Sequence, residues 1–160
     1  MTGKIPEFHL EQFLPYLVHR VGSRLAEGFE DSLDQAGLSL QEWRAAAVLY
    51  DFGPQTMGDI ARRTNINAST MTRLIGQMEK QNLVKRERPV ANQRTVNVRL
   101  LTEGRRRVLN LIPKVIDYED NVSACFSETE LRTFKTLLEK FFHSLVDEGR
   151  SIDNPEQMAG

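Results

Sequence analysis

The chain has 160 residues, of which 40% are hydrophobic and 27% are charged, and its formal net charge is −1. This length fits one domain with a hydrophobic core but not two independent ones. The single cysteine excludes an intramolecular disulfide framework. Residues 1–6 lack the apolar segment of a signal peptide, and no stretch approaches the length of a membrane span, so we expect a cytoplasmic protein.

The N-terminal part of the chain is predicted to form one long helix over residues 8–36. Apolar residues recur there at helical spacing, and Gly37 is expected to end the helix. Pro15 lies inside this stretch. Because proline cannot donate a backbone hydrogen bond, it should kink the helix or begin a new first turn.

Two shorter helices are predicted next. Ser39 and Glu42 have the spacing of a capping box, which would open a helix that runs through Tyr50. Thr56 can cap the following short helix together with Asp59, three residues further on.

The next helix is predicted over residues 68–80, after a turn in which Asn65 and Asn67 suit the turn and the N-cap. Its buried stripe has spacing i, i+3, i+4 and i+7 and consists of Met71, Leu74, Ile75 and Met78. Its other face carries hydroxyls, one long cation and one amide: Ser69, Thr70, Thr72, Arg73, Gly76 and Gln77. Such side chains can hydrogen-bond base edges and phosphates, although this helix considered alone would be interpreted as having a solvated face.

A basic β-hairpin is predicted after this helix. Asn82 can take the left-handed conformation that ends a helix, in place of the usual glycine. Residues 83–88 form the first strand, and residues 95–100 alternate with period two, as a half-buried strand does. The polar loop 89–94 joins the strands. A long guanidinium on such a loop suits the narrow minor groove, where negative potential is concentrated.

Two further helices are predicted, from Thr102 to Cys125, with a bend at Pro113, and from the Ser127-x-x-Glu130 capping box to Gly149. The first and last helices of the chain carry more large apolar residues than a lone surface helix needs. Pairing of two chains would bury this excess, and the expected interface residues are Phe13, Leu17, Leu137, Leu138, Phe141, Phe142 and Leu145. Alternatively, these helices cover one another within a monomer.

Charge is segregated along the chain. The segment from Ala61 to Arg107 contains twelve Lys and Arg residues and three acidic residues, giving a net charge of +9, while the remainder carries −10. A charge run is usually only a solvated surface. Here it coincides with the order helix, helix, hairpin, and it therefore predicts a nucleic-acid-binding face.

This segment resembles the MarR family of bacterial transcription regulators, which are dimeric winged-helix proteins that often release DNA when they bind a small molecule. The resemblance rests on LSLQEWRAAAVLYDFGP, which is similar to the family's second helix, and on NQRTVNVRLLTEGR, which is similar to its wing, and it spans roughly residues 8–149. The family usually has Asp-x-Arg at the wing. This chain keeps Arg94 but has Asn92 in place of the carboxylate, and it has Leu101 where the family commonly has Thr.

The resemblance implies a mainly α fold with a small β-hairpin wing, that is, a winged helix-turn-helix lobe with a helical dimerisation region. We expect one domain, 1–160, with the lobe at 39–101, dimerisation helices at 8–36 and 102–149, and a flexible tail at 150–160. The predicted DNA-binding residues are Asn67, Ser69, Thr70, Thr72, Arg73, Gln77, Arg86, Arg88, Asn92, Gln93 and Arg94.

The predicted function is sequence-specific binding of double-stranded DNA by a homodimeric transcriptional regulator, a repressor, on a pseudo-palindromic operator. Two alternatives stay open. One is a DNA-architectural protein that uses the same fold without any ligand. The other is a winged-helix adaptor that binds proteins, which the +9 segment disfavours.

A small aromatic or phenolic effector is also expected by resemblance, in a pocket between the dimerisation helices and the lobe. The candidate lining residues are Tyr16, His19, Arg20, Trp43 and Arg44. An aromatic wall beside a guanidinium suits an aromatic carboxylate or a phenol. Alternatively, Trp43 belongs to the core and Arg44 is a surface ion-pair partner.

Catalytic chemistry has no support in the sequence. His9, His19 and His143 are scattered without metal-ligand spacing, and no P-loop, GxSxG motif or glycine-rich nucleotide turn occurs. We therefore expect that the protein is not an enzyme and that it binds neither a cofactor nor a metal ion. Cys125 is expected to be an inert, partly buried thiol.

Overall fold

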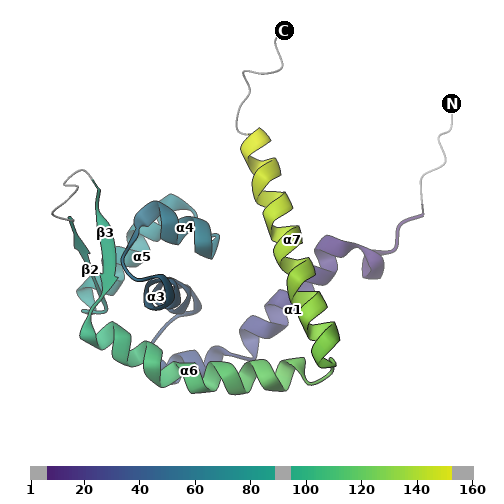
Figure 1. Cartoon of the computed structure of the whole chain (residues 1–160), viewed down its shortest axis with the longest axis horizontal. Helices are drawn as coiled ribbons and strands as arrows, with labels where there is room; N and C mark the ends of the chain where they lie inside the picture. The colour runs from purple at the N-terminus through teal and green to yellow at the C-terminus, as the bar shows by residue number, and fades with distance from the viewer. Residues whose placement is uncertain (1–6, 89–94, 153–160) are drawn as a thin grey trace, which may run out of the picture. The chain divides into compact units, whose positions relative to one another are not determined.

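The computed structural model describes residues 7–88 and 95–152, with side chains up to residue 146 (Figure 1). It is mainly helical with one small antiparallel sheet of three strands, which confirms the predicted fold class. The chain divides into two compact units, Met1–Tyr118 and Glu119–Gly160. Among the described residues, no helix combines the length and the hydrophobicity that crossing a bilayer requires.

The prediction of one long N-terminal helix is wrong. The segment contains a short 3₁₀ helix and two α-helices, η1 (Leu10–Gln12), α1 (Leu14–Glu27) and α2 (Glu30–Ala36). Pro15 lies in the first turn of α1, where its missing N–H would have no helical partner in any case. Gly37 ends α2 in the left-handed conformation with φ 64°, as expected.

At the break between α1 and α2, Gly28 packs against a residue far away in the sequence. Tyr118, on α6 (Thr102–Ser123), donates its hydroxyl proton to the carbonyl oxygen of Leu25 at 2.8 Å. A Cβ on Gly28 would lie 2.8 Å from that hydroxyl oxygen. The aromatic side chain therefore occupies the space that a larger residue at position 28 would need.

Both predicted caps of the next two helices are confirmed. The side chain of Ser39 accepts from the Glu42 amide at 3.2 Å and the Glu42 carboxylate accepts from the Ser39 amide at 2.9 Å, at the start of α3 (Leu40–Phe52). Thr56 caps α4 (Met57–Thr64) by accepting from the Asp59 amide at 3.1 Å. The first of these helices extends two residues beyond the predicted Tyr50, to Phe52.

The helix predicted over residues 68–80 is α5 (Ala68–Lys80), with the same bounds. Asn65 makes the preceding turn in the left-handed conformation with φ 53°, and the Asn67 side chain accepts from the Thr70 amide at 2.8 Å. Asn82 follows the helix with φ 58°, as predicted. Local polar residues therefore define both ends of this helix.

The hairpin is present as β2 (Val84–Glu87) and β3 (Asn97–Leu100), antiparallel, with Val84 opposite Leu100. Residues 89–94 of the predicted loop lie outside the described residues. A third strand that was not predicted, β1 (Gln55–Thr56), pairs with β3 and completes a sheet of order β1-β3-β2. The sheet thus ties the start of α4 to the hairpin.

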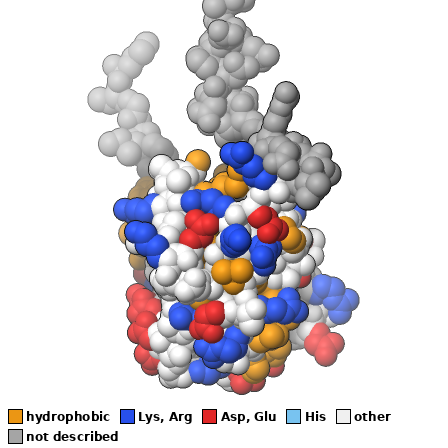
Figure 2. Space-filling model, turned by 90° about the vertical axis from the view of Figure 1, so that its left-hand side faces the viewer, with side chains coloured by type: hydrophobic (Ala, Val, Ile, Leu, Met, Phe, Trp, Pro, Cys, Tyr) orange, Lys and Arg blue, Asp and Glu red, His pale blue; other side chains and the backbone are white. Residues whose placement is uncertain are grey.

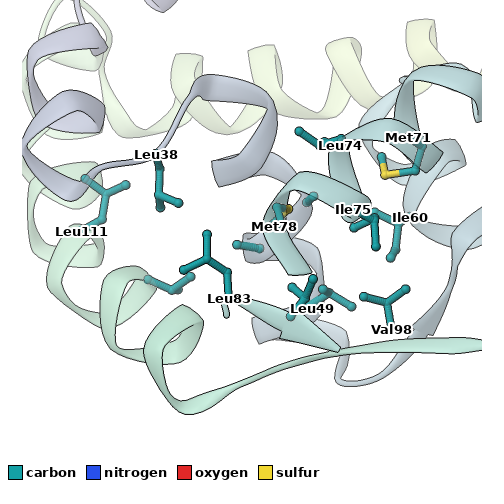
Figure 3. Close-up of a cluster of buried hydrophobic side chains, with 14 of the residues drawn as sticks. Leu38, Leu49, Ile60, Met71, Leu74, Ile75, Met78, Leu83, Val98 and Leu111 are labelled. Carbon is teal, nitrogen blue, oxygen red and sulfur yellow. The ribbon is translucent and has the colours of Figure 1, made fainter. Parts of the chain in front are cut away.

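A single cluster of buried side chains holds α3, α4, α5 and the sheet together (Figure 3). All four residues of the predicted α5 stripe belong to it, and Ile75, Met71 and Met78 are 0% exposed. Further members come from the other elements and include Leu49, Ile60, Leu83, Val98 and Leu111. This burial fixes which face of α5 points away from the protein.

The C-terminal part contains α6 and α7 (Glu128–Ile152). Pro113 lies inside α6, which ends at Ser123 rather than at the predicted Cys125. Ser127 caps α7 with Glu130, since the Ser127 amide donates to the Glu130 carboxylate at 2.8 Å, as expected. The predicted end at Gly149 is wrong, because a glycine inside a helix costs only about 1 kcal/mol and need not end it.

Candidate nucleic-acid interface

The outward face of α5 carries the residues that were predicted to read DNA. Ser69, Arg73 and Gln77 are exposed, and Thr70 is half-buried. This orientation follows from the sequence, because the four apolar residues on the opposite side are buried in the core. The long side chains of Arg73 and Gln77 extend from positions one helical turn apart, so both can reach the same groove.

The first turn of α5 uses part of this polar set for its own stability. The Asn67 side-chain oxygen accepts from the Ser69 hydroxyl and from the Thr70 amide, both at 2.8 Å. The Thr72 hydroxyl donates to the Ala68 carbonyl oxygen at 2.9 Å. Asn67 is therefore a helix cap in this structure, and Thr72 makes the local hydrogen bond that is common for threonine in helices.

Arg86 of β2, which was predicted as a DNA contact, is bound to α5. Its guanidinium Nη1 lies 2.9 Å from Glu79 Oε2, and Nη2 donates to the Thr72 carbonyl oxygen at 3.1 Å. Its backbone amide also donates to Glu79 Oε1 at 2.8 Å. Arg88 follows the same strand and is exposed, whereas Asn92, Gln93 and Arg94 lie outside the described residues.

All three acidic residues of the basic segment pair with arginines of the same segment. Glu79 pairs with Arg86, Glu87 Oε2 lies 2.6 Å from Arg99 Nε, and Glu103 accepts from Arg106 and Arg107 at 2.7 and 2.9 Å. Basic side chains on the wing side are accordingly interspersed with acidic ones rather than forming one uninterrupted patch (Figure 2). The acids are neutralised locally, so the excess of cations sets the sign of the potential on the lobe.

Nearby hydrogen-bond donors lower the pKa of two carboxyl groups, that of Glu103 in this segment and that of Asp59, which lies just before it. Hydrogen bonds from Arg106 and then Arg107 lower the pKa of Glu103 from 4.5 to about 2. The Thr56 hydroxyl and then the Arg62 guanidinium, whose Nη2 lies 2.5 Å from Asp59 Oδ1, lower the pKa of Asp59. Both carboxylates are near helix N-termini, where the helix dipole also favours negative charge.

Other cations of the segment pack on aromatic rings. The Arg63 guanidinium carbon lies 3.8 Å from the centre of the Phe52 ring, and that of Arg105 lies 5.1 Å from the centre of the Tyr50 ring. Such contacts join α4 and α6 to α3. A charge count on the sequence cannot distinguish these cations from those that face outward.

A pocket of about 280 Å³ lies within the first unit and contains two of the five predicted effector residues, Trp43 and Arg44. Tyr16, His19 and Arg20 are not among its lining residues. Its remaining lining residues are Gly22, Leu25, Ala26, Phe29, Leu40, Val115 and Tyr118. The rings of Phe29 and Tyr118, 5.2 Å apart, supply the aromatic wall. Sequence reasoning missed them because no motif links these positions.

Apolar residues are exposed on helices of both units. In the first unit Phe13 is 47% exposed and Leu17 is 38% exposed. In the second unit the exposed residues of α7 include Leu137, Leu138, Phe142 and Leu145, and Phe141 is half-buried. Large apolar side chains exposed close together on one helix can mark a protein interface.

The described residues contain no cluster of three or more His, Cys, Asp or Glu side chains that could hold a metal ion. Cys125 is exposed, so the expectation of a partly buried thiol is wrong. It lies in the short connection between α6 and α7.

The lobe is similar to known proteins. Residues 36–95 match the model of the MarR family. The uncharacterized HTH-type transcriptional regulator YsmB of Bacillus subtilis is 28% identical over 145 residues, covering 91% of this chain and 98% of the relative.

The solved structures that are similar in fold include NadR and MepR. NadR in complex with 4-hydroxyphenylacetate has a TM-score of 0.75 at 23% identity, covering 86% of this chain and 97% of NadR. The MepR–DNA complex of S. aureus has a TM-score of 0.74 at 22% identity, covering 84% of this chain and 98% of MepR. Residues 36–95 thus match the MarR family, and over most of its length the chain is similar to an HTH-type transcriptional regulator.

Proposed function

We propose that the chain is a sequence-specific regulator that binds double-stranded DNA and represses transcription from the site it covers. The observation that carries this proposal is the outward face of α5, where Ser69, Arg73 and Gln77 stand opposite a fully buried stripe. An arginine and a glutamine can each make two hydrogen bonds to the edge of one base in the major groove. The solved complex of MepR with DNA supports the assignment by similarity of fold.

Base reading by Gln77 is the part of this proposal that is most directly tested. Duplexes selected from random sequence with the wild-type chain should share a motif, and Gln77→Ala should relax one or two base pairs in each half-site. The binding free energy for the selected duplex should become less favourable by about 1–3 kcal/mol. Gln41→Ala, at an exposed position of α3, is the matched control. Equal weakening on all sequences by Gln77→Ala would assign the residue to the DNA backbone instead.

The proposed active species is a homodimer. Pairing through the apolar residues of α1 and α7 would bury surface that is exposed in the single chain and would give two copies of α5 for one DNA site. The operator would then be an inverted repeat. The wing residues Asn92, Gln93 and Arg94 are proposed to contact the flanking minor groove.

We also propose that the pocket beside Trp43 binds a small aromatic acid or phenol that releases DNA. The lining supports this ligand class, because Phe29 and Tyr118 offer apolar rings and Arg44 offers a guanidinium for a carboxylate. NadR was solved with 4-hydroxyphenylacetate, a compound of the same class.

The sequence contains one tryptophan, so binding in this pocket can be followed without labelling. Titration with 4-hydroxyphenylacetate should change the fluorescence of Trp43, and Arg44→Gln should weaken that response. DNA affinity should fall over the same ligand concentrations. A fluorescence change without any loss of DNA affinity would favour the alternative of a DNA-architectural protein.

A further inference from the structure

Three contacts join strand β2 to helix α5 through one side chain and its backbone. Arg86 binds the Glu79 carboxylate with both its guanidinium Nη1, at 2.9 Å, and its backbone amide, at 2.8 Å. Its Nη2 reaches the Thr72 carbonyl oxygen at 3.1 Å. The guanidinium thus holds two points on α5 that are seven residues apart, which is close to two helical turns.

The position of Arg86 in the strand explains this geometry. Side chains alternate along a strand, so Arg86 lies on the same face as Val84, which is buried, while Lys85 is exposed on the other face. The side chains of Arg86 and Glu79 are only 35% and 28% exposed. The pair is therefore held between the strand and the helix rather than lying free in solvent.

We propose that Arg86 is a positioning residue, which fixes the angle between the wing strand and α5 and does not itself bind DNA. The proposal rests on the proposed function, because α5 and the wing must engage one DNA molecule together. Among the described residues, the Arg86 guanidinium bonds to Glu79 and Thr72 of α5, so the position of the hairpin strand is tied to that of the helix. Both elements then meet the DNA in one fixed relative orientation.

Removing Glu79 should change DNA affinity in opposite directions, depending on whether this residue acts through its charge or by holding Arg86 in position. This difference makes the proposal testable. An acidic residue beside a DNA-binding face repels phosphate, so its loss alone should strengthen binding. If Glu79 instead holds Arg86 in place, Glu79→Ala should weaken binding. The expected loss is about tenfold, comparable to that of one bidentate base contact.

The experiment measures the affinity of the full chain for a selected duplex at several salt concentrations. Arg86→Ala and Glu79→Ala should weaken binding by the same factor, and the double variant should be no weaker than either one. Arg86→Lys should also weaken binding, since an ammonium keeps the charge but has one nitrogen in place of the two that reach Glu79 and Thr72. The slope of log K against log salt should stay at the wild-type value. Glu139→Ala, an exposed acid on α7, is the control for loss of charge alone.

Two outcomes would overturn the proposal. If Glu79→Ala binds DNA more tightly than wild type, Glu79 affects DNA affinity through its charge and not through its contacts with Arg86. A slope reduced by about 0.9 in Arg86→Ala would mean that Arg86 binds a phosphate directly.

Hydrogen exchange on the free protein separates this proposal from the proposed function. The Arg86 amide should exchange faster in Glu79→Ala, because its acceptor is gone. An unchanged exchange rate overturns the positioning role even if DNA binding is normal. If wild type binds no DNA while the exchange rate rises, the proposed function fails and the link between strand and helix remains.

Discussion

Gly104 of α6 lies directly against the carbonyl oxygen of Leu83. A Cβ on Gly104 would be 2.1 Å from that oxygen, which also accepts a hydrogen bond from the Leu101 amide at 2.9 Å. The Leu83 oxygen is a backbone atom and Gly104 is buried in α6, so neither can move aside as a flexible side chain would. This contact joins the start of β2 to the first turn of α6.

Gly104→Ala should therefore destabilise the protein. Overpacking in a closed site costs about 1–3 kcal/mol and more when the backbone must move. Urea unfolding followed by circular dichroism measures this free energy. A stability equal to that of wild type would show that the strand and the helix can separate at little cost.

Gly76 presents the opposite case, and Gly76→Ala is predicted to stabilise the protein while it weakens DNA binding. No atom lies within 4 Å of a Cβ at this position, so alanine should gain about 1 kcal/mol from helix propensity. The position lies on the outward face of α5 beside Arg73, however, where a methyl group would hold the helix away from the groove. We expect a loss of roughly 1 kcal/mol or more in binding, comparable to a mismatched base pair.

Thermal unfolding and DNA affinity of the same samples test this prediction, with Gly58→Ala on α4 as the control. That position is exposed and its nearest atom is 3.9 Å away. Unchanged affinity in Gly76→Ala would mean that the centre of this face does not approach DNA.

The carboxyl group of Glu103 should titrate at about pH 2 in the folded protein. Arg106 and Arg107 favour its charged form, and the pKa falls from 4.5 to about 2. Since the folded value is depressed, the stabilisation by these ion pairs is complete above about pH 4.5 and is lost as the pH falls towards 2. Carbon-detected NMR measures the pKa, and the combined variant Arg106→Gln, Arg107→Gln should return it towards 4.5. A wild-type value near 4.5 would contradict these contacts.

Leu138→Glu is predicted to prevent dimer formation. Leu138 is 42% exposed on α7 and is proposed to be buried against a second chain, where an unpaired carboxylate would cost several kcal/mol if it stays ionised. Sedimentation at micromolar concentration should show dimeric wild type and monomeric variant. Lys140→Glu, an exposed neighbour, makes a larger change in charge and should stay dimeric. A wild-type monomer would contradict the proposed assembly.

The sequence predicted those elements whose signals are local. The bounds of α5 were correct because Asn67 caps it, Asn82 ends it and apolar residues repeat between them. The capping boxes at Ser39 and Ser127 were correct for the same reason. Strand β1 was missed, since two residues carry no periodicity and their pairing depends on β3.

The features that sequence reasoning could not supply arise from contacts between distant residues. Leu25 and Phe29 continue the helical spacing through Gly28, but the chain breaks there, where Tyr118 of α6 packs against Gly28 and bonds to the Leu25 carbonyl oxygen. Likewise, counting charges correctly located the basic segment but could not tell that Arg86 binds Glu79. The same holds for the pocket, which Tyr118 and Trp43 line together only in the folded chain.

The protein is proposed to be a dimer whose two α5 helices read bases. The spacing of the half-sites in its DNA tests this proposal most directly. Duplexes selected from random sequence should contain an inverted repeat with half-sites centred about one helical turn, roughly 10 bp, apart. Inserting five base pairs between the half-sites turns one of them to the far side of the duplex, and tight binding should be lost. Selection that enriches no repeat, or tight binding that survives the insertion, would contradict the account.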